Sequence, residues 1–490
     1  MSEARKVLFL AAEAAPYSKV GGLADFAGEL PAALRELGLD VRLMMPRYGA
    51  KVAGGSAPSS VRPLGRAIQV PVGPMEEPAY VIEASAALIP TYLISNEQYF
   101  SSRERVYGFG DDAQRFVYFS RAVVAAVETL GWTPDLIHAN DWHTAAVPAW
   151  LGTYGRSSSV HRKIASLFTV HSLAYQGVYG RLLLSFGRMS RVPHLSAEQP
   201  GKVNWVAQGI AHSDVVNTVS PSYAAQMRSG ELDSALKQLL VAKGERFVGI
   251  PNGIDMRVWD PAADSALVQA YDAHSTRLRA VNKTALQREL QLNTDPSVPL
   301  LGLVTRLDRT KGIEILVEAI SDLLQQREAQ FALLGTGEAE YETSLKELQA
   351  RFPRNVRVAC RFDDRLARRF YAGLDLYLAP SLTEPASTGV LLAMRYGAVP
   401  VVRMTGGLRD SVIDYRSDPR TGTGFGFDEY SSRALGIAIG AALEVLGTNH
   451  QGWLSIQCRA MSIDHSWATS ARRYAALYED ACRAHEHGSP

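Results

Sequence analysis

Short apolar runs alternate with stretches of helical spacing along the chain, and this rhythm strongly limits the possible folds. In the first half, the apolar runs are KVLFLAA (6–12), DVRLMMP (40–46), DLIHAND (135–141), ASLFTVH (165–171) and DVVNTVS (214–220). Near-continuous apolar strands that alternate with helices are typical of a parallel sheet covered on both faces. The sequence therefore predicts an α/β fold, with residues 6–12 as its first buried strand rather than a signal peptide.

The same rhythm starts again in the second half of the chain. Its apolar runs are PLLGLVT (299–305), AQFALLG (329–335), NVRVACRF (355–362), LDLYLAPS (374–381) and AVPVVRM (398–404). Between the halves, VGIPNGIDMRVWDP (248–261) is rich in Pro, Gly and Asn, which is typical of a linker. Ligands of such sheets bind beyond the carboxyl ends of the strands, and in two-domain proteins the cleft between domains is the usual site.

These patterns predict four segments. Residues 1–247 form an N-terminal α/β domain, 248–262 a hinge, and 263–462 a C-terminal α/β domain. Residues 463–490 form a terminal helix, with helical spacing in Trp467, Tyr474, Leu477 and Tyr478, that packs back toward the N-terminal domain. The Gly- and Ser-rich stretches 49–60 and 155–163 predict surface loops.

Composition narrows the class of protein. The 490 residues include 51 Lys and Arg against 50 Asp and Glu, so net charge offers no reason to expect nucleic acid or an anionic membrane as partner. No apolar run approaches the ~18–20 residues of a membrane span. The three cysteines, Cys360, Cys458 and Cys482, lie far apart without a CxxC pair, so neither a disulfide framework nor a zinc site is indicated. We expect a cytoplasmic protein.

The loop after the first strand has the properties of an anion site. Gly21 and Gly22 allow close approach of the backbone, the following helix directs N–H groups at the same place, and Lys19 adds a positive charge. The pattern is not GxGxxG, and no acid stands at the ribose position about 20 residues on, which disfavours a dinucleotide. The alternative is a tight turn with a surface lysine.

Polar residues end two more strands of the first half. HANDWHT contains His138, Asp141 and His143, and TVHSL contains His171. Side chains at the carboxyl ends of strands in one sheet should converge. A metal site here is disfavoured, because the two histidines and the aspartate lie on a turn and no HxxxH pair stands on a helix. For His171, a purely structural hydrogen-bonding role is the alternative.

The second half offers cations and a carboxylate. Arg306 and Lys311 lie in a strand-to-helix loop at a helix N-terminus, where basic residues have no helical reason to be, and a bound phosphate would supply one. Glu384 ends a strand in the same half. Ser387, Thr388 and Gly389 follow at the start of a helix, where hydroxyl and N–H groups suit phosphate. A further glycine pair, 406–407, follows the next strand. The alternative is a set of solvated loop charges.

Taken together, these motifs resemble one family. KVGGLADFAGELPAAL, HANDWHT, HSLAYQGVYG, NTVSPSYA, PNGIDMRVWDP, TRLDRTKG and TEP…LLAMRYGAVPVVRMTGGLRDSVID occur in this order across residues 6–480. The sequence resembles the bacterial glycogen synthase and plant starch synthase family. The resemblance implies a GT-B fold, with two Rossmann-like domains facing a central cleft. Residues 1–247 would be the acceptor-side domain, and residues 263–462 would bind the nucleotide sugar. It implies transfer of glucose from ADP-glucose to the non-reducing end of an α-1,4-glucan, with retention at the anomeric carbon and without a metal or cofactor.

The resemblance also implies roles for individual residues. Lys19 and the Gly21–Gly22 backbone would lie beside the donor phosphates, and Asp25 and Asp141 would line the site. His171 would bond the transferred sugar and help stabilise charge at the reacting carbon, and Arg306 and Lys311 would neutralise the departing diphosphate. Glu384 and Asn252 would contact sugar, and Phe362 stands where the family has a tyrosine under the adenine. The partners would be a nucleotide sugar and a glycogen or maltooligosaccharide acceptor, with no nucleic acid and no membrane.

One segment departs from the family. The family reads PSRFEPCGLTQLYALRYG where this chain reads PSLTEPASTGVLLAMRYG (380–397). Leu382 and Thr383 replace an Arg-Phe pair, residues 386–390 replace Cys-Gly-Leu-Thr-Gln, and Ser172 replaces an asparagine. The segment keeps its sugar carboxylate, Glu384, and changes its phosphate end. We therefore weigh an active transferase with altered donor preference or rate ahead of an inactive chain.

Three other functions remain open from the sequence. A transferase of the same fold that uses another nucleotide sugar, such as UDP-glucose, or another acceptor would carry most of the same residues. A catalytically silent glucan-binding protein would keep the fold without turnover. A nucleotide-dependent dehydrogenase is disfavoured by the absent GxGxxG and ribose acid.

Overall fold

The computed structural model describes residues 4–49, 60–84, 89–192 and 201–488, so the stretch 50–59 within the expected surface loop lies outside the described residues. The chain divides into two compact units. The N-terminal unit contains the residues up to Gly253 together with those from Trp467 onward, and the C-terminal unit contains Ile254–Ser466. The chain therefore passes between units twice, once inside the segment expected to be a hinge and once just before the terminal helix.

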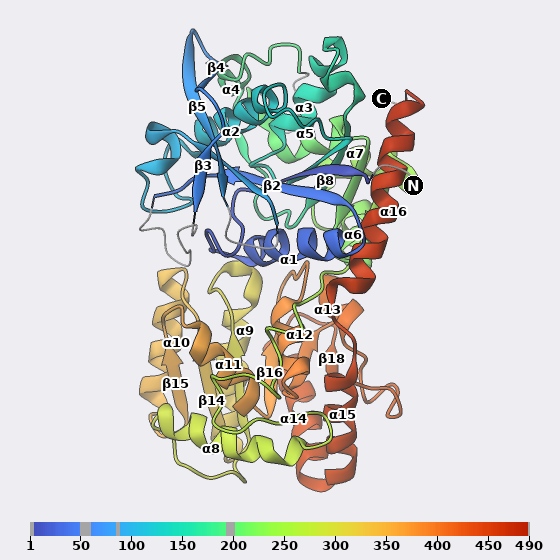
Figure 1. Cartoon of the computed structure of the whole chain (residues 1–490). Helices are drawn as coiled ribbons and strands as arrows, with labels where there is room; N and C mark the ends of the chain where they lie inside the picture. The colour runs from blue at the N-terminus through green and yellow to red at the C-terminus, as the bar shows by residue number, and fades with distance from the viewer. Residues whose placement is uncertain (1–3, 50–59, 85–88, 193–200, 489–490) are drawn as a thin grey trace. The chain divides into compact units, whose positions relative to one another are not determined.

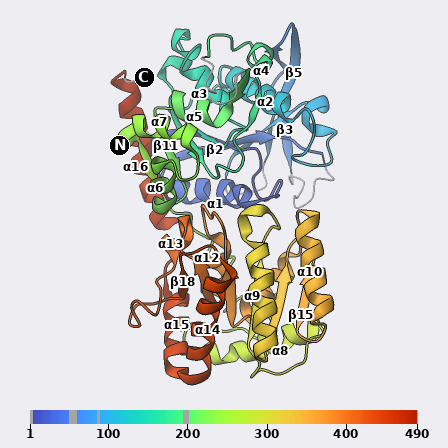
Figure 2. The same cartoon turned by 180° about the vertical axis from the view of Figure 1, so that it is seen from behind.

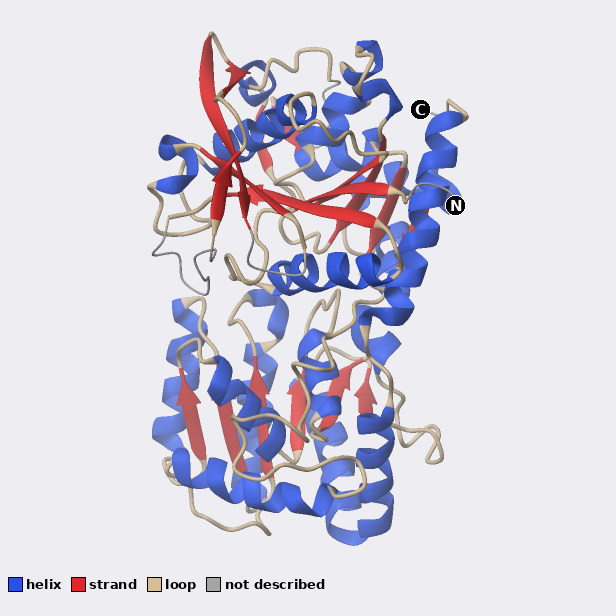
Figure 3. Ribbon diagram, viewed as in Figure 1, coloured by secondary structure: helices blue, strands red, loops and turns tan. Residues whose placement is uncertain are grey.

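One large sheet forms the centre of the N-terminal unit (Figure 3). Its strands are β1 (Lys6–Leu10), β2 (Asp40–Pro46), β3 (Val61–Pro63), β4 (Ile68–Val72), β5 (Met75–Ala84), β6 (Thr91–Ser95), β7 (Leu136–Asn140), β8 (Ala165–Val170), β11 (Val215–Thr218) and β12 (Phe247–Gly249). The order is β12-β11-β8-β7-β1-β2-β6-β5-β3, with β4 paired to β5. Pairing is parallel from β12 to β6, which confirms the predicted parallel sheet. The antiparallel β3–β5 edge was not predicted.

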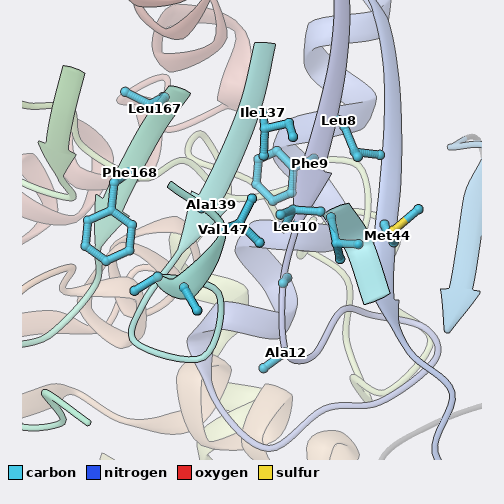
Figure 4. Packing of buried hydrophobic residues seen from close by; sticks show 14 of the residues in the cluster. Leu8, Phe9, Leu10, Ala12, Met44, Ile137, Ala139, Val147, Leu167 and Phe168 are labelled. Carbon is cyan, nitrogen blue, oxygen red and sulfur yellow. The ribbon is translucent and has the colours of Figure 1, made fainter. Parts of the chain in front are cut away.

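The core explains why the strands read as apolar runs. Leu8, Phe9 and Leu10 of β1 are fully buried, on both faces of the sheet, because helices cover each face. The register pairs Leu8 with Ile137 of β7, and Figure 4 shows Phe9 and Leu10 packed close to Ile137 and Met44. The candidate site residues lie beyond the strand ends, whereas the polar side chains of His138, Thr169 and Asn217 are buried within β7, β8 and β11.

The helices of this unit include one from the far end of the sequence. They are α1 (Gly22–Glu36), α2 (Asp112–Val127), α3 (Ala146–Leu151), α4 (Leu182–Phe186), α5 (Trp205–His212), α6 (Pro221–Ser229), α7 (Ser234–Lys243) and α16 (Trp467–Glu486), and a short pair β9 (Val178–Gly180) and β10 (Lys202–Asn204) lies outside the main sheet. Helix α16 lies along α1, β8 and β11 (Figure 1 and Figure 2). Residues 155–163, expected to be a surface loop, form short 3-10 turns in which His161 is buried, so that expectation holds only in part.

Buried hydrogen bonds join α16 to the sheet. The hydroxyl of Tyr478 lies 2.9 Å from Nδ1 of His138, whose Nε2 lies 2.6 Å from Oγ1 of Thr169. Thr169 donates to Asn217, and Asn217 donates to the hydroxyl of Tyr474. A buried polar chain of this kind is stabilising only when each member has a partner, so the terminal helix is an integral part of this unit.

The C-terminal unit contains a six-stranded parallel sheet with helices on both faces (Figure 3). Its strands are β13 (Leu300–Val304), β14 (Gln330–Leu334), β15 (Val356–Ala359), β16 (Leu376–Ala379), β17 (Val399–Arg403) and β18 (Phe425–Phe427). Its helices are α8 (Arg279–Glu289), α9 (Ile313–Gln326), α10 (Ala339–Arg351), α11 (Asp364–Gly373), α12 (Thr388–Arg395), α13 (Gly406–Ser411), α14 (Ser432–Thr448) and α15 (His450–Ser462). The order β15-β14-β13-β16-β17-β18 is the three-two-one-four-five-six order of a doubly wound Rossmann sheet.

No helix in the described part of the chain is both long enough and apolar enough to cross a membrane.

Candidate active site

Each sheet has one point where the chain reverses its direction of winding. In the C-terminal unit this switch point lies between β13 and β16, and in the N-terminal unit between β1 and β7. Loops that leave the carboxyl ends of two such strands diverge to opposite faces, and the crevice between them is the usual ligand site of a doubly wound sheet. Most of the residues predicted from the sequence follow these four strands, whereas His171 follows β8, Asn252 follows β12 and Phe362 follows β15. The structure therefore shows two candidate half-sites, one in each unit.

In the C-terminal unit, Lys311 and Glu384 meet across the switch point. Lys311 follows β13 and Glu384 follows β16, and Nζ of Lys311 lies 2.7 Å from Oε2 of Glu384. The same oxygen accepts a hydrogen bond from Ser381 at 2.9 Å. Less than a fifth of each charged side chain is exposed. The other carboxylate oxygen, Oε1, has no hydrogen-bond partner among the described residues, so it can accept a further hydrogen bond.

Arg306 is held by its own loop. Its Nε donates to Oδ2 of Asp308 at 2.7 Å, and the other oxygen of Asp308 accepts from the backbone N–H and hydroxyl of Thr310. Burial raises the pKa of Asp308, but the bonds from Thr310 and Arg306 outweigh it and leave the pKa below its usual value. Both cations therefore have carboxylate partners within the protein. A bound anion is not needed to explain their position, contrary to the argument made from the sequence.

Gly312 sets the geometry next to Lys311. It adopts φ +68°, and a Cβ at this position would lie 2.2 Å from the carbonyl oxygen of Pro380. The chain after β13 thus passes against the chain after β16 at a distance that only glycine permits. This contact holds the loop of Lys311 beside the loop of Glu384.

The segment that departs from the family follows Glu384. Ser387 is the N-cap of α12 and adopts φ +54°, and its side chain is 3% exposed. Its Oγ lies 2.7 Å from Oγ of Ser411, which donates to the carbonyl of Gly407. The Ser387 hydroxyl is therefore used inside the unit rather than presented to a ligand. Thr388 and Gly389 open the helix as predicted, and their N–H groups form the first turn of α12.

In the N-terminal unit, a buried glutamate organises the glycine loop. Oε2 of Glu13 accepts from the backbone N–H groups of Val20 at 2.5 Å and Gly21 at 3.3 Å. Burial raises the pKa of Glu13 to about 7, and these two N–H donors and the hydroxyl of Tyr107 oppose that shift. The N–H of Gly21, predicted to face the donor phosphates, is thus already bonded to Glu13. Lys19, one residue before Val20, forms an ion pair of 2.7 Å with Asp25.

The sequence does not single out Glu13, because it stands in the alanine-rich stretch LAAEAAP (10–16) at the end of the first apolar run. A single acid at the end of a buried strand is the signal that could have found it, since carboxylates are rarely buried without partners.

Asp141 and His171 lie together at the ends of β7 and β8. Asp141 adopts φ +55°, and its Oδ1 accepts from the backbone N–H of His171 at 2.8 Å. Burial raises the pKa of Asp141 to about 7 against the effect of this bond. Phe26 of α1 packs edge-on against the His171 ring at 4.4 Å between centroids. The predicted convergence of these strand ends is therefore seen for Asp141 and His171.

The neighbouring Asn140 fixes the tautomer of His171. Asn140 donates from Nδ2 to the carbonyl of Leu10, so its Oδ1 is the atom 2.9 Å from Nε2 of His171. An amide oxygen only accepts, so Nε2 of His171 carries the proton. Burial lowers the pKa of His171 to about 3, which keeps the ring neutral at pH 7. Its Nδ1 is then an acceptor, and His171 carries no positive charge.

His138 and His143 do not share this arrangement. Both ring nitrogens of His138 are bonded within the core, to Tyr478 and Thr169. The ring of His143 packs against Trp142 and Phe116, and burial lowers its pKa to about 3. These two histidines are structural residues of the N-terminal unit.

The remaining predicted residues, Asn252 and Phe362, lie outside the two switch points. Asn252 lies just before the chain leaves the N-terminal unit at Gly253, and its buried Oδ1 has no hydrogen-bond partner among the described residues. Phe362 lies between β15 and α11 with 67% of its surface exposed. The structure brings neither residue into contact with the charged pairs described above, and their predicted roles stay predictions.

Two doubly wound sheets, each with charged groups at its switch point, define a glycosyltransferase of the GT-B class. Residues 6–242 match the family described as "Starch synthase catalytic domain", and residues 298–444 match "Glycosyl transferases group 1". The chain is 39% identical to the glycogen synthase of Moorella thermoacetica, over 98% of each chain. It is 37% identical to that of Lactiplantibacillus plantarum, over 98% of this chain and 100% of the relative. The chain belongs to the glycogen synthase and starch synthase family.

Solved structures agree with this assignment. The chain is similar to the catalytic domain of starch synthase IV from Arabidopsis thaliana bound to ADP and acarbose, with a TM-score of 0.91 and 30% identity over 98% of this chain and all of that one. It shares only the fold with sucrose-phosphate synthase from Thermosynechococcus elongatus, at a TM-score of 0.62 and 19% identity over 98% of this chain and 100% of that one. The predicted GT-B fold and glycosyltransferase activity are thus confirmed.

Proposed function

We propose that the protein transfers glucose from ADP-glucose to the non-reducing end of an α-1,4-glucan, with retention at the anomeric carbon, in the cytoplasm. The observation that carries the proposal is the Lys311–Glu384 pair, which sets an ammonium and a carboxylate 2.7 Å apart at the switch point of a Rossmann sheet. The ammonium of Lys311 suits a diphosphate, and the carboxylate of Glu384 suits a sugar hydroxyl. The solved relative from Arabidopsis thaliana, bound to ADP and acarbose, supports this donor and this class of acceptor.

In this mechanism, the main electrostatic task is to stabilise the departing ADP. Lys311 and Arg306 supply the positive charge, and neither loop reorganises during the reaction because Glu384 and Asp308 hold the two side chains in place. Arg306 is half exposed, so its guanidinium can form a two-pronged contact to phosphate oxygens while Nε stays on Asp308. The proposal uses no metal ion and no cofactor.

The N-terminal residues act on the sugar. Nδ1 of neutral His171 accepts a hydrogen bond from a sugar hydroxyl. Because the ring is uncharged, it adds no unfavourable positive charge near the oxocarbenium-like carbon. Asp141 lies beside it and stabilises such a carbon when ionised. Lys19, the backbone at Gly22, and Asp25 complete the donor contacts, and Thr388 and Gly389 offer N–H groups at the start of α12.

Retention follows from attack on the face from which ADP leaves. The ADP oxygen takes the proton of the acceptor hydroxyl, so no enzyme carboxylate becomes a nucleophile. In the C-terminal half-site the carboxylates Glu384 and Asp308 are both committed to cations, which fits a role in positioning.

The altered segment 382–390 favours a second candidate, a transferase of the same family with a different donor nucleotide. Leu382 replaces a cation that the family presents beside the pair Glu384–Pro385, and the Ser387 hydroxyl is turned inward. A silent glucan-binding protein is a third candidate, although it would have no use for both charged pairs.

Glucose transfer to glycogen tests these candidates directly. The measurement compares ADP-glucose, UDP-glucose and GDP-glucose as donors for the wild type and for Glu384→Ala. Turnover with ADP-glucose that collapses in the variant supports the proposal. Turnover with another donor selects the second candidate, and glucan binding without any turnover selects the third. The anomeric configuration of the new bond, measured by NMR, tests retention.

A further inference from the structure

Arg403, the last residue of β17, joins the loops that follow the two neighbouring strands. In the sheet, β17 lies between β16 and β18. Nη1 of Arg403 donates to the carbonyl of Leu382 in the loop after β16 at 2.8 Å, and its Nε donates to the carbonyl of Asp428 after β18 at 3.0 Å. Because the donors of a guanidinium form a rigid planar fork, these two bonds fix one loop relative to the other.

The bond to Leu382 acts on the loop that carries Glu384. Backbone bonds hold the same loop at two other points. The N–H of Leu382 donates to the carbonyl of Thr310 at 2.8 Å, and the N–H of Gly407 donates to the carbonyl of Glu384 at 2.8 Å. Of these bonds, the one from Arg403 comes from a side chain, so a substitution can remove it and leave the others in place.

Tyr430 extends these contacts to the loop of Lys311. The guanidinium carbon of Arg403 lies 5.5 Å from the centre of the Tyr430 ring. The ring lies beside Gly312, where an added Cβ would be 3.4 Å from Cε2 of Tyr430. The Tyr430 hydroxyl donates to Oε1 of Glu314 in the first turn of α9. Burial and this bond raise the pKa of Tyr430, so the hydroxyl stays protonated and continues to donate.

We propose that Arg403 and Tyr430 are positioning residues for the Lys311–Glu384 pair, with Arg403 holding the loop of Glu384 and Tyr430 the loop of Lys311. This inference rests on the proposed function, in which the pair contacts the donor. Stabilisation of a departing diphosphate depends on where the charges are held, and a displacement of about 1 Å can lower the rate by about 10². Loss of either contact should therefore lower kcat more than it raises KM.

Steady-state glucose transfer to glycogen tests the proposal, with the donor that the wild type uses best. Arg403→Met keeps the length of the side chain without its donors, and it should lower kcat about tenfold while KM for the donor changes by less than about threefold. Arg403→Lys keeps one donor and should recover part of the loss. Tyr430→Leu should lower kcat about tenfold, and Tyr430→Phe, which keeps the ring and loses the bond to Glu314, about threefold.

Arg409→Met is the matched control. Arg409 also donates twice to a backbone carbonyl, that of Met404 at 3.1 and 2.8 Å, and it pairs with Asp428 at 2.9 Å. None of these contacts reaches the loops of the Lys311–Glu384 pair, so Arg409→Met should keep the wild-type kcat. Equal losses of kcat in Arg403→Met and Arg409→Met would overturn the proposal, as would a rise in KM that matches the loss of kcat.

Acetylation of Lys311 measures the positioning role without turnover. In the folded wild type, acetic anhydride should label Lys311, whose side chain is 18% exposed, more slowly than Lys346, which is 61% exposed. Peptide mass spectrometry gives the ratio of the two rates. Arg403→Met should raise this ratio about threefold, because the pair opens more often, and Arg409→Met should leave it unchanged.

The labelling ratio also separates this inference from the proposed function. If no donor supports transfer in the wild type, the proposed function fails and the ratio alone decides whether Arg403 positions the pair. An unchanged ratio in Arg403→Met overturns the inference whatever the activity. Melting curves establish that each variant is folded, and if Arg403→Met does not fold, the ratios of Arg403→Lys and Tyr430→Phe decide in its place.

Discussion

Nζ of Lys311 lies 2.7 Å from Oε2 of Glu384, although the two residues stand 73 positions apart in the chain. Strands β13 and β16 are neighbours in the sheet, and Gly312 lets their loops touch, so the pair is a direct product of the strand order. The pair also couples the two tasks that we propose for this half-site, since the group that holds phosphate is oriented by the group that holds sugar.

We expect the two residues to behave as one unit in kinetics. Lys311→Ala and Glu384→Gln should each lower kcat/KM for ADP-glucose by about 10²–10³. The double variant should lose much less than the product of the two factors, because each single change already disrupts its partner. Lys346→Ala is the matched control. It breaks an exposed Lys346–Glu342 pair of α10 and should leave kcat/KM unchanged. If the double variant loses the product of the two single-variant factors in kcat/KM, Lys311 and Glu384 act independently.

Glu13 should make stability depend on pH. Burial raises its pKa from the model-peptide range to about 7, so the folded state favours the protonated form. The resulting stabilisation is complete below about pH 4 and is lost as pH rises through 7. Asp141, whose pKa is also raised to about 7, acts in the same direction. The wild-type melting temperature should therefore fall between pH 5 and pH 8, and Glu13→Gln should reduce that fall by several degrees. If the melting temperatures of the two proteins fall in parallel with pH, Glu13 does not titrate with a raised pKa in the folded protein.

The contact between His485 and Asp214 should have a pH dependence centred nearer neutrality. Nε2 of His485 donates to the carbonyl of Arg162 and Nδ1 faces the Asp214 carboxylate at 3.3 Å, so the doubly protonated ring fits best. The hydrogen bond to Asp214 raises the pKa of His485 above its usual 6.5. The stabilisation is complete below about pH 6 and is lost as pH rises through the raised pKa.

This second effect should be small, about 0.5 kcal/mol, because the histidine is partly exposed. Melting curves of wild type and His485→Gln should differ by 1–2 °C at pH 6 and converge at pH 9, by the usual relation between free energy and melting temperature. A difference that grows toward pH 9 would show that the contact is not an ion pair.

Gly312→Ala should damage the half-site through the backbone. The added Cβ would meet the Pro380 carbonyl at 2.2 Å at a φ of +68°, so the loops of Lys311 and Glu384 must separate. We expect a loss of about 2 kcal/mol or more in the free energy of unfolding and a large fall in kcat. Gly440→Ala, in the middle of α14 with open space around it, should instead stabilise by about 0.5–1 kcal/mol. Chemical denaturation of both variants measures the contrast, and equal stability would refute the close contact.

Much of the fold could be predicted because both sheets are buried on two faces. Their parallel strands leave near-continuous apolar runs, and candidate site residues such as Asp141 and His171 follow where strands end. The antiparallel strands β3, β4 and β5 gave no such signal, since they lie at the sheet edge and mix exposed with buried positions.

Within the site, residue types could be read from the sequence but partners could not. Nothing local indicates that Glu13 bonds the N–H of Gly21, that Ser387 turns toward Ser411, or that Asp308 holds Arg306. The contact of Ser387 depends on its positive φ, and the contact of Glu13 depends on which loops face one another in the folded unit. Two groups expected to bind phosphate are already hydrogen-bonded within the protein. The N–H of Gly21 donates to Glu13, and the hydroxyl of Ser387 bonds that of Ser411.

Leu382 tests whether the altered segment sets donor preference. Its backbone N–H donates to the carbonyl of Thr310 and its carbonyl accepts from Arg403, both at 2.8 Å, so the loop is held without its side chain. Leu382→Arg should therefore preserve the loop and add a guanidinium next to Glu384. If the lost arginine limits use of ADP-glucose, kcat/KM for that donor should rise by about tenfold, the value of one charge-assisted phosphate contact. Leu382→Lys should give a smaller rise and Leu382→Met none. If kcat/KM is unchanged for every donor, the substitution at 382 is neutral. If kcat/KM rises for ADP-glucose and falls for UDP-glucose, residue 382 determines donor preference.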